Sequence, residues 1–363
     1  MKKFELFYDT ETGEAFFQGI NVAIEGEHTM LSEIQKECEK IVGPSTKIMM
    51  YNAAKKFSKE IFPYYLSYKG TKGEATNREI TLELLDLLSN LGYGLFSIES
   101  YDEKNLEFGV KVKNCCNALI HGKSNKQICY AISGVLACLF ELVFRKEMFC
   151  EEISCNSQGH EFCRFKITSS GRDIKTIKGE CKIKIQKEKA KREYIYFDES
   201  TGKIKVRGMN VLIFPRCWIA EIQKEFERII GPATKTIFYN INKKCTINDL
   251  PSIINSNIIA KILKKLSKRK LMFELFRDAN MLGYGIIELQ EFNEDSAEIK
   301  IKIKNCYNSV GYINTKKPIC YYTTGLISGA SEVIFERGMD CIETKCKGKG
   351  DDYCEFYAHP TKY

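Results

Sequence analysis

The sequence lacks an apolar run long enough to cross a bilayer. The longest candidate, residues 128–144, is short and contains Glu141, and its counterpart at 319–335 is interrupted by threonine, serine and glycine. A spanning helix needs about 20 predominantly apolar residues. Both segments therefore predict buried core helices, and we expect no membrane span.

The amino terminus also lacks the features of a secretory signal. Two lysines after the first methionine run directly into mixed apolar and acidic residues, with no apolar core and no small-residue cleavage site. We therefore expect a cytoplasmic, reducing location. Disulfides are rare there, so the 16 cysteines are expected to be metal ligands or small buried side chains.

Motifs of several functional classes are absent as well. There is no dinucleotide fingerprint, phosphate loop or nucleophile elbow, and a reductase would need a site for its electron donor. The net charge of +8 is concentrated in residues 172–192 and 261–270, without a helix-turn-helix, zinc finger or aromatic-basic strand beside it. These absences argue against an enzyme and against a nucleic-acid partner.

What the chain does have is the composition of a folded protein and an internal repeat. Its 363 residues are 44% hydrophobic and 28% charged, enough for about two globular domains. Three segments return at a nearly constant offset: 33–47 as 221–235, 91–94 as 282–285, and 112–117 as 303–308. This duplication predicts a first domain at 1–168, a basic linker at 169–193 and a second domain at 194–363.

Each copy predicts the same order of elements. In the first copy, apolar spacing predicts helices at 31–42 and 77–91, strands at 94–100 and 106–112, a long apolar helix at 128–144 and a closing hairpin at 149–167. Helices followed by clustered antiparallel strands are typical of an α+β fold. We expect an antiparallel sheet packed with helices in each copy.

Only some of the cysteines recur in both copies. Three of them, together with a glutamate, form the pattern Glu-x2-Cys-x3-Gly-x3-Cys with one further cysteine upstream. The four residues are Cys129, Glu152, Cys155 and Cys163 in the first copy, and Cys320, Glu343, Cys346 and Cys354 in the second. Cys115 and Cys150 also recur, as Cys306 and Cys341.

This pattern predicts a metal site in each copy. Seven residues between the two cysteines allow a tight hairpin, and the glycine between them permits the positive φ of such a turn. Three thiolates and a carboxylate form a tetrahedral set that zinc accepts, and four protein ligands indicate a structural site. The alternatives are ordinary buried cysteines, or a disulfide between Cys155 and Cys163. Recurrence in register favours metal, and we expect about two zinc ions per chain.

The same residues carry a resemblance to a known family. Glu-x2-Cys-x7-Cys, preceded by Cys-Tyr-x3-Gly at 129–134 and 320–325, resembles the 4-vinyl reductase domain. That family includes sensor domains of phenol- and xylene-responsive regulators and stand-alone archaeal proteins. Its fold is related to a core subunit of the TRAPP tethering complex.

The resemblance implies zinc ligands at the eight positions given above. It also implies a largely apolar ligand cavity near each zinc, for which we expect Phe108, Val112, Ile301 and Ile303 as lining residues. The aromatic sensors have a tryptophan where this chain has Val112 and Ile303. The difference favours an aliphatic, hydrocarbon-like or bulkier apolar ligand.

Three functions follow as hypotheses. The first is a non-catalytic module that binds or senses a small apolar ligand and signals through a separate protein partner, because the regulators' output domains are not present in the sequence. The second is a structural or assembly protein resembling the TRAPP subunits, and the third is a component associated with a reductase. Since many family members pair as dimers, we expect either a monomer with a pseudo-twofold pairing of its two copies or a homodimer.

Overall fold

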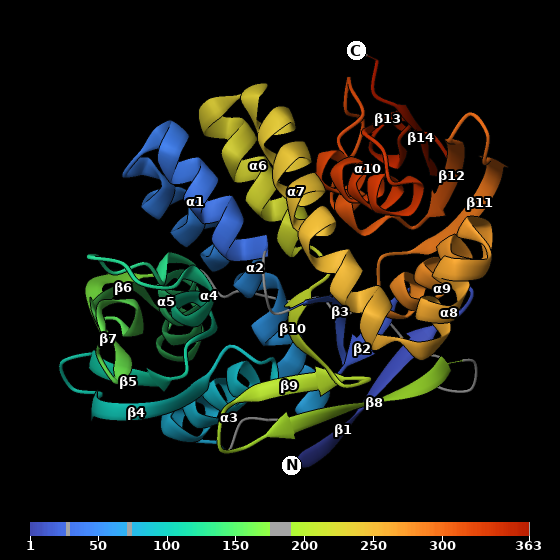
Figure 1. Ribbon diagram of the computed structural model, residues 1–363. Coiled ribbons are helices and arrows are strands. Elements are labelled where there is room, and N and C mark those ends of the chain that lie inside the picture. Colours follow the sequence, from blue (N-terminus) through green and yellow to red (C-terminus); the bar gives the residue numbers. More distant parts are fainter. Residues whose placement is uncertain (27–29, 71–74, 175–189, 363) are drawn as a thin grey trace. The chain divides into compact units, whose positions relative to one another are not determined.

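The computed structural model describes residues 1–26, 30–70, 75–174 and 190–362 (Figure 1). The first copy of the repeat contains β1 (Lys2–Asp9), β2 (Ala15–Phe17), β3 (Ile20–Gly26), α1 (Met30–Val42), α2 (Ser45–Lys69), α3 (Asn77–Asn90), β4 (Leu95–Asp102), β5 (Glu107–Lys113), α4 (Cys116–His121), α5 (Tyr130–Phe144), β6 (Lys146–Ser154) and β7 (Phe162–Asp173).

The second copy repeats this order with small differences. It contains β8 (Ala190–Asp198), β9 (Lys203–Val206), β10 (Met209–Pro215), α6 (Trp218–Ile230), α7 (Ala233–Ser256), α8 (Ile258–Leu266), α9 (Lys268–Met281), β11 (Ile286–Asn293), β12 (Glu298–Lys304), α10 (Tyr321–Phe335), β13 (Met339–Lys345) and β14 (Cys354–Pro360). The helices and strands predicted between residues 31 and 167 are confirmed, with ends that differ by a few residues.

Each copy contains a four-stranded antiparallel sheet crossed by one helix. The strand orders are β4-β5-β7-β6 and β11-β12-β14-β13. On β5 and β12 the side chains alternate between buried and exposed, because successive residues of a strand point to opposite faces. The apolar helices α5 and α10 pack on the sheets, against β6 and β13 (Figure 1). The α+β prediction is therefore confirmed.

Helix α2 is a long element that the sequence analysis did not predict. Its buried residues include Met49, Met50, Ala53 and Ala54, which lie on more than one side of the helix, so no single apolar stripe identifies it. It packs along α5, and Lys55 Nζ lies 2.6 Å from the buried carboxylate of Glu141. This pairing explains how a glutamate is tolerated inside the apolar helix α5.

The recurring glycines of the long helices serve this same packing. A Cβ on Gly134 would lie 2.2 Å from the Tyr51 carbonyl oxygen of α2, and a Cβ on Gly325 would lie 2.2 Å from the Tyr239 carbonyl of α7. From the sequence, these glycines are expected to allow a close approach between the two long helices themselves. That assignment is wrong, since each glycine faces a helix of its own copy.

A closed six-stranded barrel is the second element that sequence reasoning missed. Its strand order is β1-β2-β3-β10-β9-β8, so each copy contributes three strands. β3 and β10 pair antiparallel, with Ile24 opposite Ile213. These strands are short and lie outside the segments where the repeat is most evident, which left them without a clear sequence signal.

Packing divides the chain into two compact units. Unit 1 comprises residues 1–7, 16–187 and 192–225, and unit 2 comprises 8–15, 188–191 and 226–363. Unit 2 thus includes the β1–β2 turn, whose Thr12 carbonyl accepts a hydrogen bond from Asn305 Nδ2 at 3.2 Å. Unit 1 includes the β8–β9 turn, where the Thr201 carbonyl accepts from Asn114 Nδ2 at 3.0 Å. The turn of each leading hairpin therefore belongs to the unit that holds the other copy's four-stranded sheet.

Most of the expected basic linker, residues 175–189, lies outside the described residues. The boundaries proposed for the two domains and the pseudo-twofold pairing stay predictions. Among the helices that the structure describes, none is both long and apolar enough to cross a membrane.

Candidate metal centre

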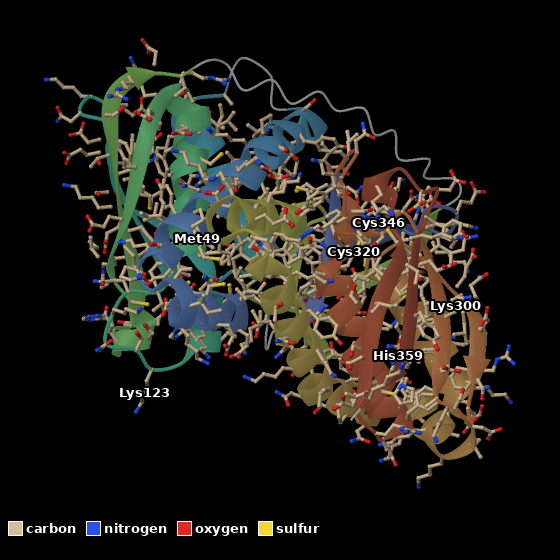
Figure 2. The ribbon with its side chains drawn as sticks, turned by 90° about the horizontal axis from the view of Figure 1, so that it is seen from above. Met49, Lys123, Lys300, Cys320, Cys346 and His359 are labelled. Carbon is tan, nitrogen blue, oxygen red and sulfur yellow. The ribbon has the colours of Figure 1, made fainter. Side chains whose placement is uncertain are left out.

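The four residues of each predicted metal site come together from three elements. We call Cys129, Glu152, Cys155 and Cys163 site 1, and Cys320, Glu343, Cys346 and Cys354 site 2. In site 1, the first cysteine immediately precedes α5, the glutamate and second cysteine lie at the end of β6, and the third cysteine lies at the start of β7. Figure 2 shows the corresponding Cys320 and Cys346 of site 2 close to each other.

The turn between the two hairpin cysteines has the predicted backbone. Residues 156–158 and 347–349 form single 3₁₀ turns, and the glycines that follow have φ of 91° at Gly159 and 108° at Gly350. Side chains other than glycine rarely adopt such angles. The glycine thereby allows the chain to reverse within a few residues and returns the second sulfur to the first.

The distances between the ligand atoms fit one metal ion in each site. All four ligand atoms lie within 4.8 Å of one another. In site 1, the Sγ atom of Cys129 is 3.8 Å from that of Cys155 and 3.7 Å from that of Cys163. In site 2, the Sγ atoms of Cys320 and Cys354 are 3.6 Å apart. Zinc–sulfur bonds of about 2.3 Å in a tetrahedron place sulfurs about 3.8 Å apart.

The glutamates show why a cation suits these sites. Glu152 Oε2 accepts a 2.8 Å hydrogen bond from the Cys129 backbone N–H, and Glu343 Oε2 accepts the same bond from Cys320. The other oxygen, Oε1, is buried without a hydrogen-bond partner in both residues. Burial, reinforced by the neighbouring cysteine, raises the pKa of Glu152 to about 8 and that of Glu343 to about 9. A metal ion bound to Oε1 would both satisfy this atom and favour the charged carboxylate.

The sulfurs of site 1 receive more hydrogen bonds than those of site 2. Cys163 Sγ accepts from the Asn156 backbone N–H at 3.3 Å, and Cys155 Sγ accepts from the Ser157 hydroxyl at 3.0 Å. In site 2, Cys354 Sγ accepts from the Lys347 backbone N–H at 3.4 Å. The counterpart of the serine is Gly348, which has no hydroxyl. The two sites therefore have the same ligand set but different surroundings.

A fourth cysteine lies beside each site and was not assigned a role from the sequence. Cys115 Sγ is 3.5 Å from Cys129 Sγ, and Cys306 Sγ is 3.9 Å from Cys320 Sγ. Both residues are fully buried and precede short helical turns. Their recurrence in both copies was the available signal, but their distance along the chain from the hairpin motif gave no reason to place them at the metal.

The residues predicted to contact an apolar ligand are core residues of the two sheets. Val112 lies opposite Cys163 in the strand register, and Ile303 lies opposite Cys354, so both are next to the metal sites. The Phe108 ring packs against the rings of Phe140 and Phe144, with centroids 4.6 and 4.7 Å away. Ile301 is likewise buried. Their role in ligand binding stays a prediction.

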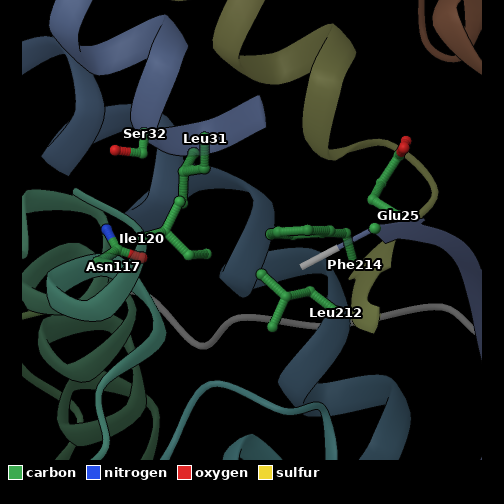
Figure 3. Close-up of a pocket in the computed structure, with 8 residues that line it drawn as sticks. Glu25, Leu31, Ser32, Asn117, Ile120, Leu212 and Phe214 are labelled. Carbon is green, nitrogen blue, oxygen red and sulfur yellow. The ribbon is translucent and has the colours of Figure 1, made fainter. Parts of the chain in front are cut away.

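A small cavity lies elsewhere in unit 1 (Figure 3). Its volume is about 10 Å³, roughly the space of one water molecule. The lining is mainly apolar, and it includes the buried Ser32 hydroxyl, which has no hydrogen-bond partner. None of the four predicted ligand residues lines it. The lining residues are Glu25, Gly26, Leu31, Ser32, Asn117, Ile120, Leu212 and Phe214.

Comparison with known families and proteins agrees with the repeat. The model of the 4-vinyl reductase domain matches residues 108–169 and 299–360, which contain the two sites. Uncharacterized protein MJ1642 of the archaeon Methanocaldococcus jannaschii is 32% identical over 129 residues, 35% of this chain and 78% of that protein. MJ0150 of the same organism is 29% identical over 126 residues, which are 35% of this chain and 65%, just under two thirds, of that protein.

Solved structures show weaker likenesses. The phenol-responsive sensory domain of the transcription activator PoxR, solved with phenol, has a TM-score of 0.38 and 13% identity over 46% of this chain and 84% of that one. A vinyl-4-reductase family protein from Methanocaldococcus jannaschii has a TM-score of 0.26 and 22% identity, over 33% and 67%. Trafficking protein particle complex subunit 3 from Naegleria fowleri, bound to palmitic acid, has a TM-score of 0.32 and 14% identity, over 40% and 96%. Likenesses of this size do not extend to function.

Proposed function

Because the chain belongs to the 4-vinyl reductase domain family, we propose that it is a zinc-stabilised protein that binds or senses a small apolar ligand. It carries out no catalysis, binds about two zinc ions per chain and passes its signal to a separate protein partner. It works in the cytoplasm, where its buried thiols stay reduced.

The observation that carries the zinc part is the pair of matched four-residue sites. Each offers three sulfurs and one carboxylate oxygen within bonding range of one ion, and the carboxylate oxygen has no other partner. With all four positions filled by protein atoms, no position is left for substrate or water, as in structural zinc sites. The metal would join the start of α5 to the β6–β7 hairpin, and the start of α10 to the β13–β14 hairpin.

The ligand part has support from the family and from the cavity in unit 1. Leu31, Ile120 and Leu212 give that cavity an apolar lining, and the Ser32 hydroxyl adds one unsatisfied polar group. A mainly apolar pocket with few polar groups is the usual form of a small-molecule site. The cavity must enlarge to admit more than a water-sized group, so ligand binding would require movement of its lining side chains.

The volume of that cavity favours a second candidate, a structural or assembly protein. A ligand site usually offers a few hundred cubic ångströms, whereas this cavity has about 10 Å³. In this alternative the two metal sites stabilise the fold, and the protein acts through its surfaces rather than through a bound small molecule.

The metal part is tested by elemental analysis of protein purified without added metal. We expect about two zinc ions per chain, and the loss of one in each of Cys155→Ser and Cys346→Ser, with a lower melting temperature because metal binding is coupled to folding. Cys138→Ser is the matched control, since Cys138 is an equally buried thiol of α5 outside both sites. Full zinc occupancy in both site variants would refute the assignment.

The ligand part is tested by calorimetric titration with a series of linear aliphatic compounds. Each buried methylene contributes about 0.8 kcal/mol, so affinity should rise roughly fourfold per carbon until the cavity is full. Ser32→Ala should weaken binding of members that carry a hydroxyl more than binding of plain hydrocarbons. Absence of binding across the series would favour the assembly protein, while leaving the metal sites unaffected.

A further inference from the structure

Helix α8 (Ile258–Leu266) and the start of α9 carry a dense positive charge. Residues 258–270 contain six basic side chains and no acidic one. Three of the lysines, Lys261, Lys264 and Lys265, are exposed on α8 itself. Lys264 Nζ lies 3.8 Å from the exposed carboxylate of Glu336, a long and solvated contact that neutralises little of this charge. The segment therefore presents a local positive field whatever the net charge of the chain.

The same helix also exposes a row of large apolar side chains. Ile258 is 77% exposed, Ile259 and Ile262 are each 52% exposed, and Leu266 is 73% exposed. At about 100° per residue, these four positions fall within a sector of about 100° on one side of the helix. We call this row the apolar face of α8.

The apolar face is separate from the side of α8 that packs on its own unit. Ala260 is buried in the core of unit 2, and Leu263 packs against that core. These two residues lie next to the apolar face around the helix, and the three lysines lie on the remaining side. The helix is thus held by a narrow contact while its largest apolar side chains point away from that core.

This combination matches a helix that lies in a membrane interface. Such helices have an apolar face that enters the boundary between headgroups and acyl chains, and lysines that contact anionic headgroups. With nine residues, α8 is about 14 Å long, far too short to span a bilayer. Six cations without an acidic residue complement a negatively charged lipid surface, and neighbouring apolar residues complement the layer beneath it.

We propose that the apolar face of α8 and the basic residues around it dock the protein onto an anionic membrane surface. The binding is peripheral and reversible, and it is independent of the metal sites and of the small-molecule ligand. It adds a second binding function, at a surface of unit 2, to the function proposed above.

The test is flotation of the full-length, zinc-loaded chain with lipid vesicles. One preparation contains phosphatidylcholine with about one phosphatidylglycerol in three lipids, and the other contains phosphatidylcholine alone. We expect the chain to float with the anionic vesicles and not with the neutral ones. Added salt should weaken the binding, because it screens the lysines.

Two sets of substitutions separate the apolar and the charged contributions. The variant Ile258→Ser/Ile262→Ser/Leu266→Ser removes the apolar face, and Lys261→Gln/Lys264→Gln/Lys265→Gln removes the charge. All six positions are exposed, so the fold should persist, which circular dichroism checks. Each variant should bind at least about tenfold more weakly than the unaltered chain.

The matched control is Ile313→Ser/Lys316→Gln/Lys317→Gln, which changes one apolar and two basic exposed residues outside any helix of unit 2. It should bind like the unaltered chain. Equal binding to neutral vesicles, or unchanged binding of the serine variant, would overturn the proposal. So would light scattering that shows an oligomer lost only in the serine variant together with no vesicle binding, because a second copy would then cover the face.

Discussion

At the residue scale, the two glutamates of the metal sites connect burial, charge and metal binding. Without a cation, burial holds the protonated form of Glu152 and Glu343 up to a pKa of about 8 and about 9, respectively. With zinc, the same carboxylates and the cysteine thiols must lose their protons. The metal-free and zinc-loaded chains should therefore respond to pH in opposite directions.

For the metal-free chain, both glutamates start from an ordinary pKa of 4.5 when unfolded. The folded state binds more protons than the unfolded state between that value and about 8, so the free energy of unfolding should fall as pH rises through this window. For the zinc-loaded chain it should rise over the same window. Urea denaturation at several pH values, with and without a chelator, measures both slopes, and parallel slopes would contradict a metal at these residues.

The serine that distinguishes site 1 from site 2 gives a second prediction at this scale. Ser157→Ala removes the hydroxyl that donates to Cys155 Sγ. A hydrogen bond to a charged group contributes about 1.5–3 kcal/mol, so zinc should leave site 1 about tenfold faster or more. The measurement is transfer of zinc to a coloured chelator in a Cys346→Ser background, where only site 1 is complete.

Ser154→Ala is the control for that measurement. Its hydroxyl donates to the Phe162 carbonyl in the same hairpin and not to a sulfur. Equal release rates in the two alanine variants would show that the Ser157 hydroxyl does not stabilise the bound metal.

At the element scale, the contact between α2 and α5 depends on a single glycine. In Gly134→Ala the new Cβ would lie 2.2 Å from the Tyr51 carbonyl oxygen, which belongs to the backbone and cannot rotate away. The overpacking cost of about 1–3 kcal/mol should exceed the gain of about 1 kcal/mol in helix propensity. We expect a lower free energy of unfolding in urea denaturation.

Gly26→Ala serves as the matched substitution for that experiment. A Cβ at Gly26 meets no atom within 4 Å, so its stability should change little. If Gly134→Ala were as stable as Gly26→Ala, the two helices would have to be further apart than the structure places them.

At the scale of the whole molecule, the barrel makes the first half of the chain dependent on the beginning of the second. A fragment of residues 1–225 keeps β8 to β10, whereas a fragment of residues 1–168 ends before them and leaves β3 without its partner β10. An open strand edge with apolar residues is prone to pair with other chains. We expect the longer fragment to be a folded monomer with one zinc, and the shorter one to associate or aggregate.

Size-exclusion chromatography with light scattering and elemental analysis test this prediction on both fragments. A monomeric 1–168 fragment with the same melting temperature as 1–225 would show that the first half does not need the second. That result would favour the domain boundary that the repeat alone predicts.

The sequence by itself determined the elements whose signals are local. Alternating apolar residues identified β5 and β12, and the apolar runs before Phe144 and Phe335 identified α5 and α10. The duplicated motif identified the eight residues of the metal sites, because both copies kept them at the same spacing. The match of the 4-vinyl reductase domain to both halves of the chain agrees with that motif.

Tertiary structure alone decided the features that depend on distant segments. The barrel pairs Ile24 with Ile213, and no local pattern encodes a partner so far along the chain. The same is true of Cys115, which lies beside Cys129 only because β5 and α5 bring their ends together. Gly134 marked a close approach in the sequence, but only packing decides against which helix, since a glycine specifies the distance that its neighbour can reach and not its identity.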